Sequence, residues 1–437
     1  MTWAESFTLL IGLIIFLMII GMPVAFAFLT TNIIGVFIFL GGMAGLNQLV
    51  LNMTRSISMF YLVPVPLFVL MGELFFYTGV SNRVFTAIDK IFGGIPGRLC
   101  YITVAGGTLF ASLSGSSMAN TAMMGSMLYP DMVKRGYDPR FAMGPIMSTG
   151  GLAVLIPPSA LAVLLGSLAK INVGSLLLAG ILPALVLAIM FVVYIFTRIA
   201  LNPALAPQYP VEKATGREII VQILVNLLPA VIVIFCVIGL ILLGVATPTE
   251  SAAFGVLGVL VVAALFRCLT WSSIVGALTS SLKVSVMLLM ILMSSLTFSQ
   301  IMAFSGSTSG LINWTTGFDL GPTAMLILMF AVLMFLGMFV DQTSQMMLTL
   351  PVFMPLAASH GFDPVWFGVV ILLSLELSTM TPPFGLLLFV MLGIAPPGTS
   401  LTTIARAVAP YIAFGFILLV LLVLFPQLAL FLPGLAQ

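Results

Sequence analysis

The stretch GYDPRFAMGPIMSTGGLAVLIPPS, residues 136–159, is matched 225 residues later by GFDPVWFGVVILLSLELSTMTPPF, residues 361–384. Each stretch begins with Gly, an aromatic residue, Asp and Pro, and each reaches a Pro-Pro pair 21 residues later. Pro130 and Pro355 keep the same offset, as do the Ser-Leu pairs that begin at Ser175 and Ser400. Matched features in one register without a gap predict an internal repeat.

The composition around this repeat is that of a membrane protein. Of the 437 residues, 61% are hydrophobic and 6% are charged, whereas soluble domains carry about 25% charged residues. No charge lies between Glu5 and Arg55 or after Arg406, and each of these gaps exceeds the roughly 20 residues with which a helix crosses hydrocarbon. A soluble enzyme is therefore excluded. A nucleic-acid-binding protein is excluded too, because the few cations are scattered along the chain.

The basic residues predict how the chain crosses the lipid bilayer. Cytoplasmic loops are enriched in Lys and Arg, so the basic group within residues 134–140 is placed in the cytoplasm. If helices then alternate in direction, every basic residue except Arg55 and Lys170 lies on that same side. The amino terminus is outside when residues 6–20 and 24–40 form two separate spans.

The two copies of the repeat differ in the charge beside their first motif. Lys134, Arg135 and Arg140 flank the Gly-Tyr-Asp-Pro loop, while the Gly-Phe-Asp-Pro loop has only His360 and Asp363 nearby. The first loop is therefore expected in the cytoplasm and the second outside. The repeat is thus predicted to be inverted. Inverted repeats with interrupted helices are typical of secondary transporters, whose sites lie near the bilayer midplane at the repeat interface.

Each copy also contains a polar stretch within an apolar region. Residues 113–121 (LSGSSMANT) lie halfway along a segment that leaves and returns to the cytoplasm, and their repeat mate is the region around residues 341–344 (DQTS). These stretches predict two helical hairpins with polar tips, one over residues 98–135 and one over residues 320–359. The hairpins are expected to enter from opposite sides of the membrane.

The Pro-Pro pairs predict a broken helix in each copy. Two successive prolines remove two amide donors and push the preceding residue out of the helical region, so a helix must break there. We expect broken helices over residues 141–169 and 365–395, interrupted at Pro157, Pro158, Pro382 and Pro383. Broken backbone at membrane depth is tolerated only where it is buried in protein or lines a cavity.

The chain is therefore expected to be an all-α polytopic membrane protein forming one transporter unit over residues 1–437. We divide it into N-terminal scaffold helices with an interfacial arm (1–92), the first repeat (98–197), a linker with further scaffold helices (198–304) and the second, inverted repeat (319–432). Residues 81–91 alternate polar and apolar side chains at helical spacing, as does a helix that lies in the membrane interface. Residues 271–283 are a second candidate for such a helix.

The interruptions expose groups that can bind ions. Freed carbonyls and hydroxyls supply oxygen ligands for a cation, and helix amino termini supply positive dipole ends for an anion. The alternative for any single Ser, Thr or Gly is that it lets helices pack closely in lipid. Asp341 is the only acidic residue at a predicted tip.

Three further acids lie in apolar surroundings, where a carboxylate is costly and marks an ion path or a structural contact. They are Glu73, Glu250 and Glu376. Capping by Thr249 or pairing with a helix dipole would account for Glu250 without a function. Glu376 could either carry a proton or brace the broken helix, and the sequence does not choose.

Seven motifs in the same order resemble the large membrane subunit of TRAP transporters, the DctM type. They are MGELFFYTGVSNRVF (71–85), SGSSMANTAMMG (114–125), GYDPRFA (136–142), IPPS (156–159), ATPTESAA (246–253), VDQTSQMMLTLP (340–351) and MTPPFG (380–385). The resemblance covers essentially the whole chain. It departs from the family at Gln342, where relatives often have Thr, and near Asn120, where many have an acid.

The resemblance implies an elevator-type secondary transporter of the bacterial inner membrane, driven by sodium as the coupling ion and needing no other cofactor. It further implies a separate small four-helix membrane subunit, a soluble periplasmic substrate-binding protein and an organic-acid cargo, such as a dicarboxylate or sialic acid. The positions that match the family's ion and substrate region are Ser114, Ser116, Ser117, Asn120, Thr121, Asp341, Thr343, Ser378, Thr379 and Thr381. Sodium is assigned to Ser116, Asn120, Asp341 and Thr379.

Two other functions were weighed against this one. A proton-coupled or self-sufficient organic-anion carrier would share the same inverted hairpins. An intramembrane enzyme would need a nucleophile with a base, or a metal cluster. The chain has a single histidine, His360, in a predicted external loop, and no facing Cys or paired acids. We therefore expect no catalytic residues.

Overall fold

The computed structural model describes residues 1–58, 62–92, 95–114, 116–209, 215–317, 321–338, 340–383 and 385–435. Within these ranges it contains helices and no strand, which confirms the all-α class. The first half comprises α1 (Trp3–Ile19), α2 (Val24–Phe39), α3 (Met43–Ile57), α4 (Pro64–Tyr77), α5 (Val80–Phe92), α6 (Arg98–Ser114), α7 (Ser117–Lys134), α8 (Pro139–Leu152), α9 (Ala160–Ala169) and α10 (Val173–Leu201). The second half comprises α11 (Gly216–Gln222), α12 (Leu228–Leu242), α13 (Pro248–Leu265), α14 (Trp271–Phe304), α15 (Ser307–Thr316), α16 (Pro322–Gly337), α17 (Gln342–Ser359), α18 (Pro364–Met380), α19 (Leu386–Ile394), α20 (Leu401–Leu424) and α21 (Gln427–Leu435).

By length and composition, five described helical segments are able to cross a membrane, or six if the bent pair of α4 and α5 counts as one span. They include α10, α13 and α20, together with the run Gly216–Leu242, in which a π-helical turn (Ile223–Leu227) joins α11 to α12. The chain is therefore a multi-pass membrane protein.

The repeated Asp-Pro motif caps the start of a helix in both copies. Asp138 accepts hydrogen bonds from the amides of Arg140 and Phe141 at 2.9 and 3.0 Å, and thereby caps α8. Asp363 caps α18 in the same way. The proline that follows each Asp occupies the first helical turn, where its missing amide costs nothing. Helix starts at matching positions explain why the two motifs share one register.

The polar stretches and Pro-Pro pairs fall between helices. Gly115 lies outside the described residues, but α6 ends and α7 begins on either side of it, and α16 and α17 are likewise separate helices. The Pro157-Pro158 pair separates α8 from α9, and Pro382-Pro383 separates α18 from α19. Ser159 restarts the first of these broken helices by accepting a hydrogen bond from the amide of Ala162 at 3.2 Å.

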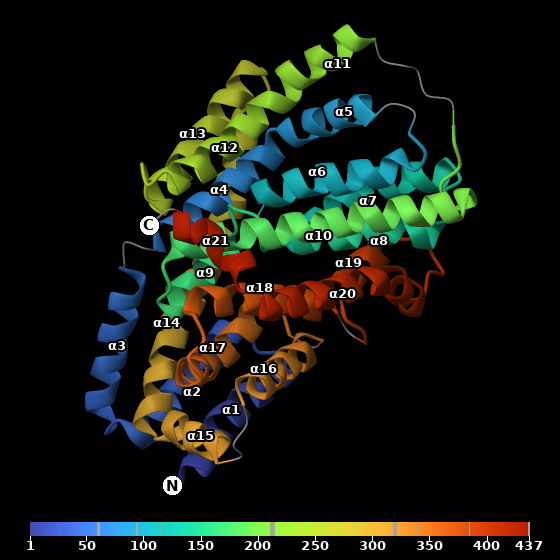
Figure 1. Ribbon diagram of the computed structural model, residues 1–437. Coiled ribbons are helices and arrows are strands. Elements are labelled where there is room, and N and C mark those ends of the chain that lie inside the picture. Colours follow the sequence, from blue (N-terminus) through green and yellow to red (C-terminus); the bar gives the residue numbers. More distant parts are fainter. Residues whose placement is uncertain are drawn as a thin grey trace.

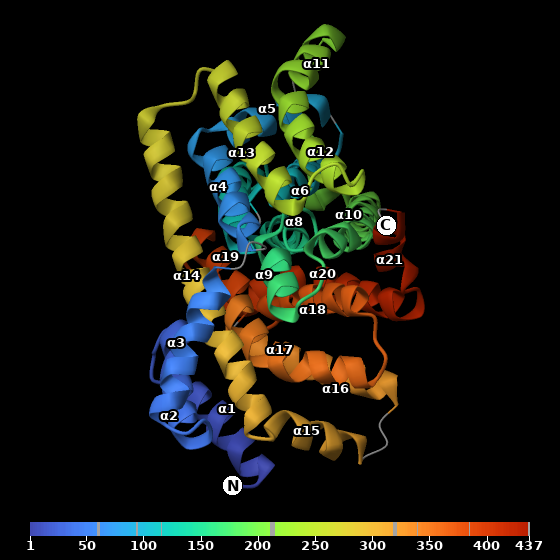
Figure 2. The ribbon, with the colours of Figure 1, turned by 90° about the vertical axis from the view of Figure 1, so that its left-hand side faces the viewer.

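Figure 1 shows the helices of the two repeats stacked through the middle of the molecule. α7, α8 and α10 lie next to α18, α19 and α20, and α6 packs against α7, α8 and α10. α11, α12 and α13 cover one end of this stack, and α1, α2, α3 and α15 lie at the other end. Figure 2 shows the long helix α14 running along one side, where it packs against α2, α3 and α4.

The amphipathic helix expected over residues 81–91 corresponds to α5. It bends by 66° from α4, and the buried side chains of Val84 and Ile88 lie on one of its faces. The buried guanidinium of Arg98, at the start of α6, forms an ion pair with Asp89 of α5. α5 is thus tied to the base of the first hairpin.

Three expectations about the scaffold need correction. Residues 271–283 do not form a separate interfacial helix, because α14 continues through Lys283 as one helix of 34 residues, about 51 Å long. Lys283 is exposed, so its charge does not interrupt the helix. Glu250 is held by Thr247 and not by Thr249: the Glu250 carboxylate accepts from the Thr247 amide at 2.8 Å, since Pro248 occupies the first helical position. α3, α15 and α21 were not expected from the sequence.

α10 packs closely against the segment between α8 and α9, and this contact gives a first testable prediction. A Cβ atom on Gly180 of α10 would overlap the carbonyl oxygen of Leu155, and backbone cannot move aside as a side chain does. We expect Gly180→Ala to destabilise the protein by about 1–3 kcal/mol, measured as a lowered melting temperature of the purified protein in detergent.

Gly12→Ala is the matched control for this substitution. Gly12 also lies in a helix, and nothing stands within 4 Å of a Cβ placed there. Its melting temperature should stay the same or rise, because alanine favours helix. Equal melting temperatures for the two variants would contradict the close contact at Gly180.

Candidate functional site

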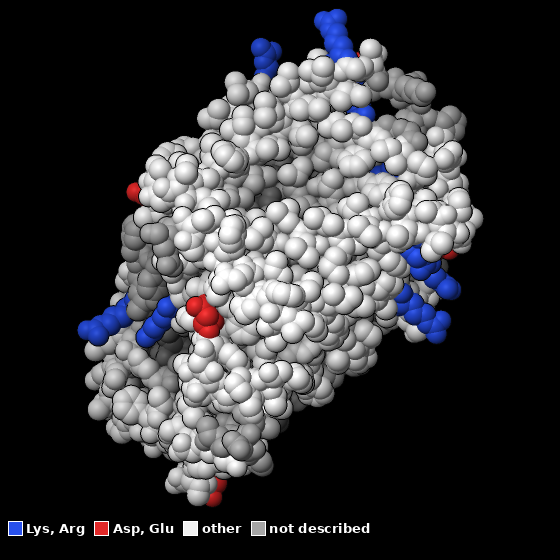
Figure 3. Space-filling view, viewed as in Figure 1, with Lys and Arg blue, Asp and Glu red and all other residues white. Residues whose placement is uncertain are grey.

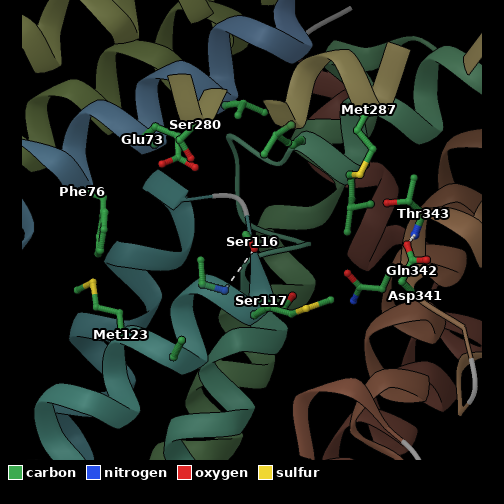
Figure 4. Close-up of a pocket in the computed structure, with 18 of the residues that line it drawn as sticks. Glu73, Phe76, Ser116, Ser117, Met123, Ser280, Met287, Asp341, Gln342 and Thr343 are labelled. Atoms are coloured by element: carbon green, nitrogen blue, oxygen red, sulfur yellow. Dashed lines mark hydrogen bonds between the residues drawn. The ribbon is translucent and has the colours of Figure 1, made fainter. Parts of the chain in front are cut away.

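Both hairpin tips open into one cavity of about 1170 Å³. Ser116 and Ser117 lie at its wall from the first tip, and Asp341, Gln342 and Thr343 from the second (Figure 4). The opposite wall is built from α4 and α14, where Glu73 lies beside Ser280. Most of the remaining lining is apolar, including Val69, Phe76, Phe110, Met123, Val284, Met287, Leu288 and Ile394.

Four described helices begin at this cavity. The first residues of α7, α9, α17 and α2 line it. Ser116 caps α7 by accepting a hydrogen bond from the amide of Ala119 at 3.3 Å. The first amides of a helix lack partners within the helix and carry the positive end of its dipole. The cavity wall therefore carries these dipole ends, and the described residues that line it include two acids, Glu73 and Asp341, and no Lys or Arg.

Asp341 caps the third of these helices. One carboxylate oxygen accepts from the amides of Thr343 and Ser344 at 3.0 and 3.2 Å, and the other accepts from the hydroxyl of Ser344. A carboxylate has about four lone-pair positions, so these bonds leave acceptor capacity on the cavity side. Asp341 thus has a structural role beside any role in ion binding.

Glu376 joins the two tips. Its side chain is 1% exposed. Its Oε2 accepts hydrogen bonds from the hydroxyl of Ser117 and from the side-chain amide of Gln342, both at 2.6 Å. Ser117 begins α7 and Gln342 begins α17, whereas Glu376 lies on α18. Of the two roles that the sequence left open for Glu376, the contacts support bracing.

A set of oxygen atoms without partners lies behind the first tip. The Asn120 side chain donates to the carbonyl of Thr149 at 2.8 Å, yet its Oδ1 has no partner among the described residues. The same is true of the hydroxyl of Thr121 and of Oε1 of Glu376. All three flank the last turn of α8, since Cβ atoms built on Gly150 and Gly151 would lie 2.6 Å from the Thr121 hydroxyl and 3.6 Å from that Glu376 oxygen.

The structure divides the site residues that the sequence singled out. Ser116, Ser117, Asp341 and Thr343 line the cavity. Asn120 and Thr121 are buried behind it. The side chain of Ser114 lies outside the described part of the chain.

The third group of predicted residues is engaged within α18. The hydroxyls of Ser378, Thr379 and Thr381 donate to carbonyls three or four residues earlier, at 2.7–2.8 Å. Ser378 also donates to Gln345 at 3.1 Å. None of these three residues lines the cavity. The four residues assigned to sodium are therefore not gathered around one point on its wall.

Gln342 is the residue that the sequence reasoning undervalued. The repeat offset could have pointed to Gln342. At an offset of 225 residues, Gln342 corresponds to Ser117 and Glu376 corresponds to Gly151. If the repeat is inverted, corresponding residues of the two copies can meet where the copies face one another. Ser117 and Gln342 do meet, on Glu376, and Gly151 lies next to that carboxylate.

Comparison with known proteins assigns this architecture to a family. The sequence model described as "Tripartite ATP-independent periplasmic transporter, DctM component" matches residues 11–428. The chain belongs to this family. The DctM family consists of large permease components of transporters, so the chain is a TRAP transporter large permease and the resemblance seen in the sequence is confirmed.

Curated DctM-family relatives match over almost their whole length. An ectoine TRAP transporter large permease protein of Halomonas elongata is 31% identical over 98% of this chain and 99% of its own. A C4-dicarboxylate TRAP large permease of Rhodobacter capsulatus is also 31% identical, over 98% of this chain and 99% of its own. A sialic acid TRAP large permease of Vibrio cholerae is 30% identical over 96% of each chain. The cargo named for relatives therefore varies.

Two solved transporters share the fold of this DctM-family chain. The Alcanivorax borkumensis YdaH transporter superposes with a TM-score of 0.64 at 14% identity, covering 88% of this chain and 90% of its own. Neisseria gonorrhoeae MtrF gives a TM-score of 0.60 at 14% identity, covering 86% and 82%. At this level of identity the likeness extends to the fold alone.

The link through Glu376 is open to mutation. In Glu376→Gln one oxygen can still accept from both donors, but the charge is lost, so two charge-assisted hydrogen bonds become weaker neutral ones. We expect a destabilisation of about 1–3 kcal/mol, seen as a lowered melting temperature in detergent. Ser117→Ala should cost less in the Glu376→Gln background than in the wild type, because the two residues interact.

Glu250→Gln is the matched control, since glutamine at this helix position preserves the capping box. Its melting temperature should equal that of the wild type. If Glu376→Gln melted at the wild-type temperature too, Glu376 would not hold the hairpins together.

Proposed function

We propose that this permease imports an organic acid coupled to a sodium gradient. The observation that carries the proposal is the cavity walled by both hairpin tips, at which four helix amino termini lie and behind which oxygen atoms lie without partners among the described residues. The first feature favours an anion and the second a cation. A coupled transporter needs both in one place.

The anionic cargo is inferred from the electrostatics of the cavity. Backbone amides and dipoles at the starts of α2, α7 and α9 attract carboxylates, whereas Asp341 occupies the start of α17. The apolar remainder of the wall suits the carbon skeleton of a small organic acid. Relatives named for C4-dicarboxylate and sialic acid support this class. The soluble binding protein would choose among its members.

The sodium site is best supported behind the first tip. Amide, hydroxyl and carboxylate oxygens are ligands for a hard cation, and Asn120, Thr121 and Glu376 each offer one at the end of α8. Of the residues first assigned to sodium, this arrangement retains Asn120, and it adds Thr121 and Glu376. Because the hydroxyl of Thr379 is engaged within its helix, Thr379 could contribute only its carbonyl. Asp341 and Ser116 would act at the cavity wall.

An inverted repeat and an elevator motion complete the proposal. The meeting of Ser117 and its repeat mate Gln342 on Glu376 supports a symmetric arrangement of the two hairpins. Hairpins held by one carboxylate would move together with α8 and α18 as a transport domain. The helices α4 and α14 on the other side of the cavity would belong to the scaffold.

The partners and the location follow from the family. A tripartite transporter of this kind would include a small membrane subunit and a periplasmic binding protein, and it would lie in the bacterial inner membrane. A proton-coupled carrier is the second candidate. The observation that favours it is the buried carboxylate of Glu376 beside the cavity, because such a group could exchange a proton.

Uptake into proteoliposomes containing all three components separates these alternatives. A ligand of the partner binding protein, found by thermal shift and then labelled, serves as cargo. We expect an inward sodium gradient to drive its accumulation and a pH gradient alone to drive none. Uptake that ignores sodium and follows the pH gradient would replace sodium with protons as the coupling ion.

Asp341 is tested by separating its charge from its capping role. Asp341→Asn retains an oxygen that caps α17 but loses the charge, so the melting temperature should stay near that of the wild type. The sodium concentration for half-maximal uptake should rise roughly tenfold or more, since the lost Coulomb attraction between carboxylate and cation exceeds the roughly 1.4 kcal/mol that a tenfold change requires. Asp341→Ala should also lower the melting temperature, because the cap itself contributes about 1 kcal/mol.

Asp363→Asn is the matched control. Asp363 caps α18 through the same two backbone bonds but does not line the cavity, so neither readout should change. Normal sodium activation in Asp341→Asn would remove Asp341 from the ion-binding groups.

A further inference from the structure

A second, smaller pocket lies away from the cavity between the hairpins. It has a volume of about 320 Å³ and shares no lining residue with the cavity. Three arginines line it, Arg140 at the start of α8, Arg198 near the end of α10 and Arg406 near the start of α20. Figure 3 shows Lys and Arg side chains gathered at the edge of the molecule beside the ends of α10 and α20. The positive charges predict that this end faces the cytoplasm.

The positive charge of this pocket is not neutralised within the described part of the chain. None of the three arginines forms an ion pair there. Arg198 donates to the hydroxyl of Tyr194 at 3.2 Å, which is a neutral acceptor. Asp138 is the one acid among the lining residues, and its Oδ1 already accepts two backbone amides as the cap of α8.

The helices that carry the arginines are held close together. A Cβ on Gly144 of α8 would lie 2.8 Å from the carbonyl oxygen of Ala407 on α20, so only glycine allows this approach. Arg140 lies one turn before Gly144, and Arg406 directly precedes Ala407. Backbone packing therefore places the attachment points of two exposed arginines close together, from where both guanidinium groups can reach one anion.

Tyr411 gives an independent indication of a ligand. Its side chain is 3% exposed and lines the same pocket. Its ring packs edge-on against Phe191 and Tyr194, with centroids 5.1 and 5.3 Å apart. The hydroxyl has no hydrogen-bond partner among the described residues. A buried donor left without a partner is costly, so an acceptor atom in the pocket would stabilise the protein.

We propose that this pocket binds the phosphate group of an anionic phospholipid in the cytoplasmic leaflet. Guanidinium groups match the oxygens of a phosphate with paired hydrogen bonds. The Tyr411 hydroxyl supplies one more donor. Basic pockets between transmembrane helices on the cytoplasmic side bind lipid headgroups in this manner.

The surroundings favour a lipid over free phosphate as the source of this group. On α10 the turns before Arg198 expose two large apolar side chains, Val193 at 54% and Phe196 at 63%. These side chains face hydrocarbon if α10 crosses the membrane, as its length and composition permit. A lipid whose phosphate enters the pocket can lay its acyl chains along this surface.

The proposal is tested by lipid titration of the purified full-length protein in detergent. Dioleoyl phosphatidylglycerol, dioleoyl phosphatidylcholine and sodium phosphate are compared by the shift in melting temperature and by lipid retention in native mass spectrometry. We expect phosphatidylglycerol to raise the melting temperature and to remain bound, and the other two to do neither. Arg406→Gln should weaken the apparent affinity for phosphatidylglycerol about fivefold, the scale of one cation at a headgroup.

Two further variants make the outcome specific. Tyr411→Phe removes only the unpartnered hydroxyl, so without lipid it should be as stable as the wild type, yet its response to phosphatidylglycerol should be smaller. Arg217→Gln removes an exposed cation of α11 that does not line the pocket, and its response should be unchanged.

Three results would overturn the proposal. One is an equal response to phosphatidylcholine, and another is an undiminished response in both Arg406→Gln and Tyr411→Phe. The third is a full shift produced by sodium phosphate alone, which would make the ligand a soluble phosphate and not a lipid. If Arg406→Gln failed to fold, Tyr411→Phe alone would decide.

Discussion

A carboxylate that is buried within a membrane protein must be hydrogen-bonded, or its desolvation is not offset. Glu376 meets this requirement at Oε2, with two donors that come from two different hairpins, Ser117 and Gln342, whereas its Oε1 has no partner among the described residues. Moving either tip away would leave the carboxylate with half of its partners. The energetics therefore favour hairpins that stay together, which is the condition for a transport domain that moves as one body.

The position of Glu376 depends in turn on the broken helices. Glu376 lies in the last turns of α18, and Gly151, in the last turn of α8, lies beside it. A Cβ on Gly151 would lie 3.2 Å from Cγ of Glu376 and 3.1 Å from Cε of Met380, so a larger residue would push the carboxylate away. The Pro-Pro pairs end both helices at this depth. The same breaks free backbone and side-chain oxygens for a cation, so one local feature supplies both the brace and the candidate ion ligands.

Much of this could be predicted from spacing and charge, and some of it could not. The hairpin tips, the helix breaks at Pro157 and Pro382 and the place of Asp341 at a tip all followed from the repeat offset. The engagement of Ser378 and Thr379 did not, because a hydroxyl in a helix can donate to a carbonyl of its own preceding turn or point outward, and the sequence is the same in both cases. The joining role of Glu376 depends on contacts between residues 34 and 259 positions apart.

The proposed anion sites differ in chemistry, and that difference fits what each would have to do. A cargo has to leave its site after every cycle, so the cavity attracts it with helix amino termini, which bind a carboxylate without the paired, charge-assisted bonds of a guanidinium. A structural lipid has no need to leave, and Arg140, Arg198 and Arg406 can hold its phosphate more tightly. With only 6% charged residues, the chain places these three arginines away from the cavity, where the proposed strong binding would stabilise the fold without slowing release of the proposed cargo.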